Sequence, residues 1–177
     1  MKIERYWAMP NKSTFTVKPI GEFVEKYSQG ALITIDPFAR NHTATHTNDL
    51  NPDTNAEHHM KAVDFLMLLK ERNIVADLVY FDPPYSLRQV KECYNNIGTE
   101  LEYKETINGY WKVEKDLINK VTIPGAVVLS FGWNSIGMGI QRGFEIEEIM
   151  LICHGGAHND TICMAERKVN QQGCLFT

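Results

Sequence analysis

Two short apolar runs in this sequence each stop at an aspartate that a proline follows. Residues 31–36 (ALITID) and 74–81 (IVADLVYF) are rich in β-branched side chains, which is typical of buried strands. Pro37 follows the first run and residues 82–85 (DPPY) follow the second, and proline cannot donate a hydrogen bond to a sheet ladder. Both runs are therefore predicted to be strands that end where the acidic side chains stand.

The segments around these strands have apolar residues at helical spacing. Ile20, Phe23, Val24 and Tyr27 fall on one helical face and predict a helix over residues 18–27. Further helices are predicted from the capping-box sequence TNAE at residues 54–57 to about residue 72, and at residues 87–97 and 110–121.

Additional strands complete the pattern. Residues 47–50 are a candidate short strand, and residues 126–131 (AVVLSF) follow a turn predicted at Pro124-Gly125. Residues 146–153 and 161–166 flank a glycine-rich loop, as the two strands of a hairpin do. The alternation predicts an α/β fold of three layers, with a mainly parallel sheet and a C-terminal antiparallel hairpin.

Composition limits the class of protein. The chain has 177 residues, 44% of them hydrophobic and 23% charged, so we expect one domain over residues 1–177. The formal net charge of −4 excludes a strongly basic nucleic-acid binder. No apolar run reaches the roughly 20 residues of a membrane helix, and the N-terminus lacks a signal-peptide core. Four cysteines without C-x-x-C spacing are expected to be free thiols in a cytoplasmic protein.

The tetrapeptide Asp82-Pro83-Pro84-Tyr85 has a specific chemical use at the end of a strand. An exocyclic amine of a nucleobase is a poor nucleophile, because its lone pair is delocalised into the ring. The Asp82 carboxylate can accept one N–H of such an amine and the Pro83 carbonyl the other, which frees the lone pair. Pro84 stiffens the loop, and Tyr85 offers a stacking surface for a base taken out of its helix. The alternative is a proline-bent loop without chemistry.

This motif resembles the catalytic motif of the S-adenosylmethionine-dependent amino-methyltransferases, which methylate adenine N6 or cytosine N4. Residues 15–20 (FTVKPI) and 36–38 (DPF) resemble two further elements of the family. Their position ahead of DPPY is similar to that in a permuted group of DNA amino-methyltransferases. Residues 130–135 (SFGWNS) and 154–160 resemble those of small phage- or mobile-element-associated members. The resemblance covers residues 13–167 and implies a Rossmann-like methyltransferase fold.

The resemblance also implies roles for single residues. The catalytic site would consist of Asp82, Pro83, Pro84 and Tyr85. The residues near the cofactor S-adenosylmethionine would be Phe15, Lys18, Asp36, Pro37, Phe38 and, as a candidate for the ribose hydroxyls, Asp49. For Asp49, an Asx-turn beside Asn48 and Pro52 is an equally good interpretation. No metal is implied.

The sequence departs from the family pattern directly after Phe38. The family motif continues into a glycine-rich turn that lets the backbone approach the cofactor, whereas Ala39-Arg40-Asn41-His42 stands here. The cofactor pocket is therefore expected to be either rebuilt or degraded.

The chain also leaves little room for a separate target-recognition domain. Recognition is expected to be loose, or to come from a homodimer or second subunit, or from the loops at residues 100–110 and 135–143. Six basic residues are candidates for a phosphate-facing surface, although an ordinary solvated face is the favoured interpretation: Lys91, Lys104, Lys112, Lys115, Arg142 and Lys168.

Two further features have competing interpretations. His154 and His158, supported by Asp160, fit a zinc site poorly, because the glycines between them favour a turn and a structural role in the hairpin. Trp133, directly after the predicted strand 126–131, either stacks on a base or closes the core, and the core is favoured.

These observations predict an S-adenosylmethionine-dependent, site-specific DNA methyltransferase that acts on the N6 amine of adenine. Direct transfer from sulfur to the amine requires neither a metal nor a covalent protein intermediate, so positioning and electrostatics would do most of the catalysis. Cytosine N4 is the alternative target, and RNA the alternative nucleic acid. A catalytically silent relative that binds nucleic acid or a partner subunit is the alternative class, and the missing glycine turn favours it.

Overall fold

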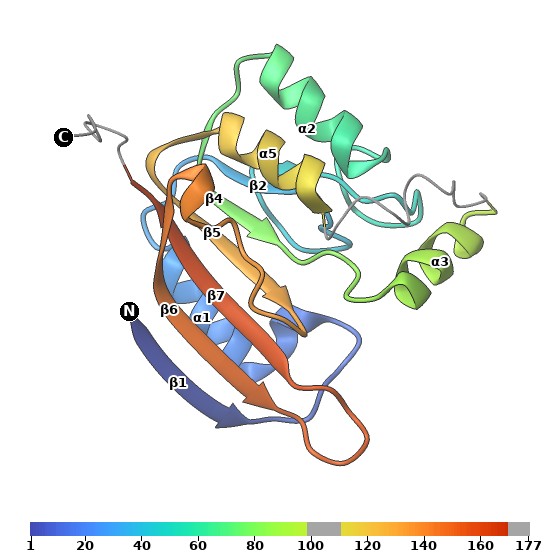
Figure 1. The fold of residues 1–177 in the computed structure, drawn as a ribbon. Coiled ribbons are helices and arrows are strands. Elements are labelled where there is room, and N and C mark those ends of the chain that lie inside the picture. Colours follow the sequence, from blue (N-terminus) through green and yellow to red (C-terminus); the bar gives the residue numbers. More distant parts are fainter. Residues whose placement is uncertain (99–110, 170–177) are drawn as a thin grey trace.

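Seven strands form one mixed sheet in the computed structural model of the chain, which describes residues 1–98 and 111–169 (Figure 1). The strands are β1 (Lys2–Trp7), β2 (Thr34–Asp36), β3 (His46–Thr47), β4 (Ala76–Phe81), β5 (Thr122–Gly132), β6 (Phe144–Cys153) and β7 (Thr161–Lys168). Their order across the sheet is β1-β6-β7-β5-β4-β2-β3. Every pairing is parallel except those of β7, which is antiparallel to both β5 and β6. The predicted mainly parallel sheet with a C-terminal antiparallel hairpin is confirmed.

Helices cover both faces of this sheet. They are α1 (Lys18–Ser28), α2 (Ala62–Glu71), α3 (Leu87–Asn96) and α5 (Lys112–Lys120), with short 3-10 turns η1 (Thr14–Thr16) and η3 (Ile140–Arg142). Side chains of β4 alternate between two cores, because successive strand residues point to opposite faces. Leu78 and Tyr80 pack with α1, whereas Val79 and Phe81 pack with α2 and α5. Figure 1 shows α1 on one side of the sheet and α2 and α5 on the other, so the three-layer prediction is confirmed.

The second helix begins later than the capping-box pattern predicts. The hydroxyl of Thr54 donates to the Asn51 carbonyl, and the N–H of Glu57 donates to Thr47 Oγ1, so neither residue caps a helix. The segment instead runs beside β3, where His58 bridges to Asn48, and α2 starts only at Ala62. The predicted helix start was wrong because Thr54 is bound within its own turn and Glu57 is bound to β3, rather than to a helix backbone.

Two predicted strand boundaries also differ. Leu32 and Ile33 precede β2, because their N–H groups donate to the Asp77 carboxylate instead of a ladder. Pro124 and Gly125 lie inside β5 rather than in a turn before it. Gly125 has φ +85°, and the pairing of β4 with β5 shifts register across this segment, so the two residues form a bulge.

The strand β1 was not predicted, and it pairs with β6 at the edge of the sheet. The predicted helices near residues 18, 87 and 112 are confirmed as α1, α3 and α5. The loop expected at residues 100–110, the helix start at Tyr110, Lys104 and Cys174 lie outside the described residues. None of the helices within residues 1–98 and 111–169 is long and apolar enough to cross a membrane.

Candidate active site

Three acidic side chains gather where β2, β3 and β4 end. Parallel strands bring their carboxyl ends to one edge, so Asp36, Asp49 and Asp82 arrive there from three different strands or the turns that follow them. Their charges act on one another. Asp36 raises the pKa of Asp82, and Asp49 raises the pKa of Asp36. The three acids therefore form one cluster at the carboxyl edge of the sheet.

Asp82 stands directly after β4 in a partly buried position. Burial raises the pKa of its carboxyl to about 6, although hydrogen bonds from the side chains of Tyr85 and Thr14 oppose that rise. The Tyr85 hydroxyl donates to Asp82 Oδ1 over 2.6 Å. A carboxyl with a pKa near 6 is ionised at neutral pH yet can still take up a proton, which suits a group that handles an amine.

The rest of the tetrapeptide is fixed by α3. The N–H of Tyr85 donates to Gln89 Oε1 over 2.6 Å, and Ser86 caps α3 by accepting the Gln89 N–H. The Tyr85 ring meets Trp133 edge-on, with 5.7 Å between ring centroids. Asp82, Pro83 and Tyr85 are thus held together by short local contacts, and the prolines need no ladder partner there.

Asp36 is engaged by residues from its own loop. The side chain is fully buried, and burial raises the pKa of its carboxyl. His42 Nδ1 lies 2.8 Å from Asp36 Oδ2, and the N–H of Phe38 donates to Asp36 Oδ1. The His42 ring packs between Phe15 and Tyr80, with centroid distances of 4.6 and 4.5 Å. His42 therefore lies between the buried acid and the Phe15 ring.

The turn after Phe38 forms without glycine. Arg40 adopts φ +51°, the left-handed conformation that glycine usually supplies. Its N–H donates to Asp49 Oδ2, and its guanidinium donates to the Lys12 carbonyl. Asp49 Oδ1 accepts the Asn51 N–H, so the Asx-turn that the sequence suggested is present. The turn is rebuilt around a carboxylate rather than absent.

The other three residues that the resemblance placed near a cofactor have different surroundings. The Phe38 ring packs against Phe81 and Trp111, on the α2 and α5 side of the sheet. Lys18 is exposed, and its ammonium lies 3.9 Å from Glu22. Pro37 contributes its carbonyl to the Asn48 side chain. Sequence reasoning missed Thr14, Arg40, His42 and Gln89, since no motif marks them.

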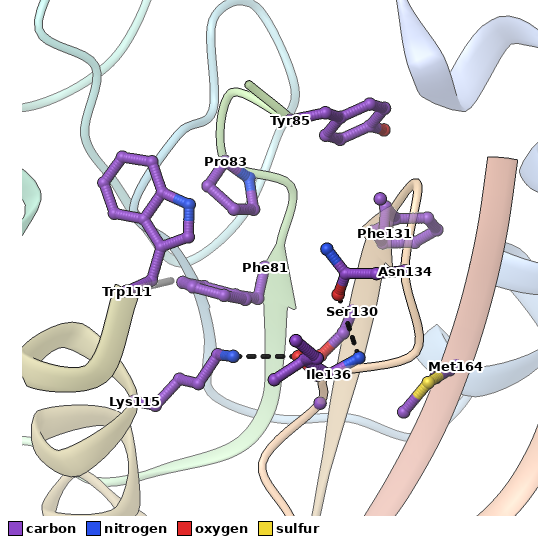
Figure 2. A pocket seen from close by; sticks show the side chains of 12 residues that line it. Phe81, Pro83, Tyr85, Trp111, Lys115, Ser130, Phe131, Asn134, Ile136 and Met164 are labelled. Carbon is purple, nitrogen blue, oxygen red and sulfur yellow. Dashed lines mark hydrogen bonds between the residues drawn. The ribbon is translucent and has the colours of Figure 1, made fainter. Parts of the chain in front are cut away.

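Two cavities flank Tyr85. The larger, about 180 Å³, is lined by the loop after β1, η1, Gln89, Trp133 and the β6–β7 loop. The smaller, about 40 Å³, lies on the α5 side between Trp111, Pro83 and Asn134 (Figure 2). Trp133 is 38% exposed at the larger cavity, so the prediction that it closes the core was wrong.

The loop that carries the exposed tryptophan is held from two sides. Lys115 Nζ donates to the Ile136 carbonyl over 2.8 Å, as Figure 2 shows. The Glu166 carboxylate accepts the N–H groups of residues 138–139 over 2.6 and 2.9 Å. A Cβ atom at Gly137 would lie 1.9 Å from Glu166 Oε2, so any side chain at this position would displace the carboxylate from its present place. The loop is therefore anchored before any ligand binds.

His154 has a structural role. Its ring nitrogens lie 2.6 Å from the Ala8 carbonyl and 2.8 Å from Thr161 Oγ1, and Asp160 accepts its backbone N–H. These contacts tie β1 to the β6–β7 loop and leave the ring without a free ligand position. Across residues 1–98 and 111–169, no group of three His, Cys, Asp or Glu side chains is placed to hold a metal ion.

Comparison with known proteins identifies the fold. No protein-family model and no curated protein sequence matches the chain. Solved structures do match: an S-adenosylmethionine-dependent methyltransferase from Agrobacterium tumefaciens is 11% identical with a TM-score of 0.54, over 83% of this chain and 60% of that one. TrmN from Thermus thermophilus is 12% identical with a TM-score of 0.53, over 86% and 49%. The chain has a Rossmann-like methyltransferase fold.

Length distinguishes these methyltransferase-fold neighbours. The chain spans about half the length of several of them, including TrmN. The Escherichia coli protein yhhF is closer in size, with 11% identity and a TM-score of 0.54 over 92% of this chain and 91% of that one. At such identities the likeness concerns the methyltransferase fold alone, and the chemistry has to be argued from the site.

Proposed function

We propose that this chain transfers the methyl group of S-adenosylmethionine to the exocyclic N6 amine of adenine in DNA. The observation that supports the proposal is the position of the DPPY segment. This segment directly follows β4, and the Asp82 carboxylate accepts a hydrogen bond from the Tyr85 hydroxyl. Tyr85 also lines the larger cavity. In open α/β sheets, ligands bind at this edge.

Asp82 and Pro83 would hold the target amine. A pKa of about 6 leaves the Asp82 carboxyl mostly ionised at neutral pH, and a carboxylate offers about four acceptor positions. Tyr85 and Thr14 each occupy one of them, and the remaining positions let the amine donate one N–H to Asp82 and the other to the Pro83 carbonyl. Both hydrogen bonds orient the nitrogen lone pair, and Tyr85 supplies an aromatic surface for the base.

The cofactor would bind along the same edge, where it supplies an electrophilic methyl group on sulfur. Phe15 offers an aromatic surface there, and Asp49 accepts two backbone N–H groups, which leaves lone pairs for a cis-diol. These two residues fit the group. Asp36 fits it only after His42 moves, because the Asp36 carboxyl is buried and bound to that ring.

A catalytically silent module is the second candidate. The observation that favours it is the same contact between Asp36 and His42, together with the Arg40 side chain on the Lys12 carbonyl. Both occupy the region where the family pattern has a glycine turn. In that case the chain would bind nucleic acid or a partner subunit without turnover.

Methyl-group labelling separates these candidates. The protein is incubated with unmethylated DNA and S-adenosylmethionine that carries a deuterated methyl group, and nucleosides are analysed by mass spectrometry. We expect labelled N6-methyladenine, its loss in Asp82→Ala, and a reduced rate in Tyr85→Phe, which keeps the ring and removes the bond to Asp82. Label on cytosine N4 would transfer the assignment to that amine.

A sample without any label would favour the silent module. The reaction is repeated with RNA and with cell extract, because we also propose that a second copy or another subunit contributes target recognition. Light scattering with and without DNA measures whether the chain self-associates. A monomer that methylates DNA by itself would contradict the need for a partner.

A further inference from the structure

The larger cavity is built from segments that are distant in sequence. The loop after β1 contributes Asn11, α3 contributes Gln89, and the β6–β7 loop contributes His158 and Asn159. Tyr85 forms part of its wall, so the cavity continues directly from the proposed amine site. A ligand in this space would touch Tyr85 and the three surrounding segments at once.

The lining of this cavity contains no carboxylate, ammonium or guanidinium group. None of its twelve lining residues is Asp, Glu, Lys or Arg; they are apolar, aromatic, hydroxyl, amide and imidazole side chains. Amides and hydroxyls both donate and accept hydrogen bonds, as the edges of nucleobases do. A phosphate is usually held by arginine or lysine. The lining therefore suits bases rather than the sugar-phosphate backbone.

Two tryptophans are exposed, one on the wall of this cavity and one beside the β6–β7 loop that contributes to the wall. Trp133 is 38% exposed on its wall. Trp7 is 69% exposed, and its ring lies 3.3 Å from the position that a Cβ of Gly155 would take, beside the β6–β7 loop. Arg5 lies over the Trp7 ring at 5.6 Å. Aromatic and guanidinium planes of this kind stack on bases that have left a helix, whereas the bases inside a duplex are already stacked.

Several cations of the described residues are bound to the protein's own groups. Arg142 Nε donates to Asp116, Arg167 to Glu147, and Lys26 to Glu148. Two of the basic residues singled out in the sequence bind the protein's own carbonyls: Lys115 binds that of Ile136, and Lys168 those of Asn119 and Thr122. These five cations are therefore engaged within the protein, and the net charge is −4. Duplex binding depends mainly on phosphate neutralisation.

We propose that the substrate is an unpaired nucleic-acid strand, with the base next to the target stacked on Trp133 and the following one reaching Trp7. The inference rests on the proposed function for the position of the target base. It goes beyond that function by naming the form of the nucleic acid. Stacking, not phosphate contact, would supply most of the affinity.

Equilibrium binding to the full chain tests this inference. Fluorescence anisotropy is measured with a labelled single-stranded DNA 12-mer, the RNA of the same sequence, and the DNA duplex, at two salt concentrations. We expect a single strand to bind at least tenfold more tightly than the duplex, with a weak salt dependence. Whichever single strand binds better identifies the sugar. Equal or tighter duplex binding would overturn the inference.

Variants locate the stacking surface. Trp133→Ala is expected to weaken single-strand binding by about five- to a hundredfold, and Trp133→Phe to retain most of it. Leu32→Ala is the matched control, since Leu32 is an exposed apolar side chain that precedes β2, away from the cavity lining. Trp133→Ala with unchanged affinity and an unchanged unfolding transition would overturn the stacking role.

The failure of the proposed function would look different. Asp82→Asn is expected to keep single-strand binding, because the stacking groups remain. Tight single-strand binding without any methyl transfer would remove the proposed function and leave this inference standing. Methyl transfer to a duplex at the same rate as to a single strand would overturn the single-strand inference and leave the proposed function standing.

Discussion

Replacing Asp82 by asparagine is expected to make the protein more stable at pH 8. Burial raises the pKa of this carboxyl from 3.8 to about 6, so keeping it ionised opposes folding. At about 1.36 kcal/mol per pKa unit, the difference corresponds to about 3 kcal/mol. The side chain is partly exposed, and solvent screening reduces this value, so we expect a gain of about 1 to 3 kcal/mol. The asparagine oxygen can still accept the Tyr85 hydroxyl.

The dependence on pH distinguishes this gain from better packing. The folded chain holds the Asp82 proton more tightly than the unfolded chain does. The stability of the unchanged protein therefore falls as pH rises from 3.8 to about 6, and this contribution is constant above that range. The advantage of Asp82→Asn should be complete at pH 8 and fall below about 1 kcal/mol at pH 4.

Urea denaturation followed by tryptophan fluorescence measures the difference at both pH values. Asp53→Asn serves as the control, because Asp53 is an exposed carboxyl in the loop before α2. The slope of the unfolding free energy with urea should stay the same. The raised pKa of Asp82 would be refuted if Asp82→Asn were less stable than the unchanged protein at pH 8. It would also be refuted if the gain in unfolding free energy were the same at pH 8 and pH 4.

Three further outcomes are expected. The kcat/KM of methyl transfer should fall about tenfold per pH unit below about pH 6, because protonation of Asp82 removes an acceptor for the amine; a flat profile from pH 5 to 8 would contradict this. Arg40→Gly should be more stable than Arg40→Ala by about 1 kcal/mol in thermal denaturation, since the backbone there is left-handed; equal melting temperatures would remove that argument. His42→Ala should lower the free energy of unfolding by about 1 to 3 kcal/mol, because it leaves the buried Asp36 without its ring partner. No change in urea denaturation would mean that water replaces the ring.

The parts of the fold that depend on apolar periodicity could be predicted from sequence. The apolar runs around residues 78 and 128 became β4 and β5, and the spacing of Ile20 and Phe23 placed α1. The start of α2 could not be predicted, because Thr54 fits a helix cap and a loop equally well and only its neighbours decide. The strand β1 alternates poorly, and almost all of it is exposed, so its pairing with β6 left little pattern in the sequence.

The candidate site was predictable where residue type alone determines chemistry. Asp82 and Tyr85 stand together because they are three residues apart in one loop. The contact between Asp36 and His42 was missed, since a histidine six residues beyond a strand carries no motif. The sequence pattern suggested that the turn after Phe38 needs a glycine. In the structure, Arg40 adopts the left-handed backbone conformation instead, and its N–H donates to Asp49.

The fit of Gly137 beside Glu166 has a consequence for how this protein can diverge. A side chain at residue 137 and a carboxylate at residue 166 exclude each other, because they would occupy one volume. The N–H groups of residues 138–139 need the carboxylate, so a change at either position is tolerated only with a compensating change at the other. Among related sequences these two positions should therefore change as a pair, and the tryptophan-bearing loop should change shape whenever they do.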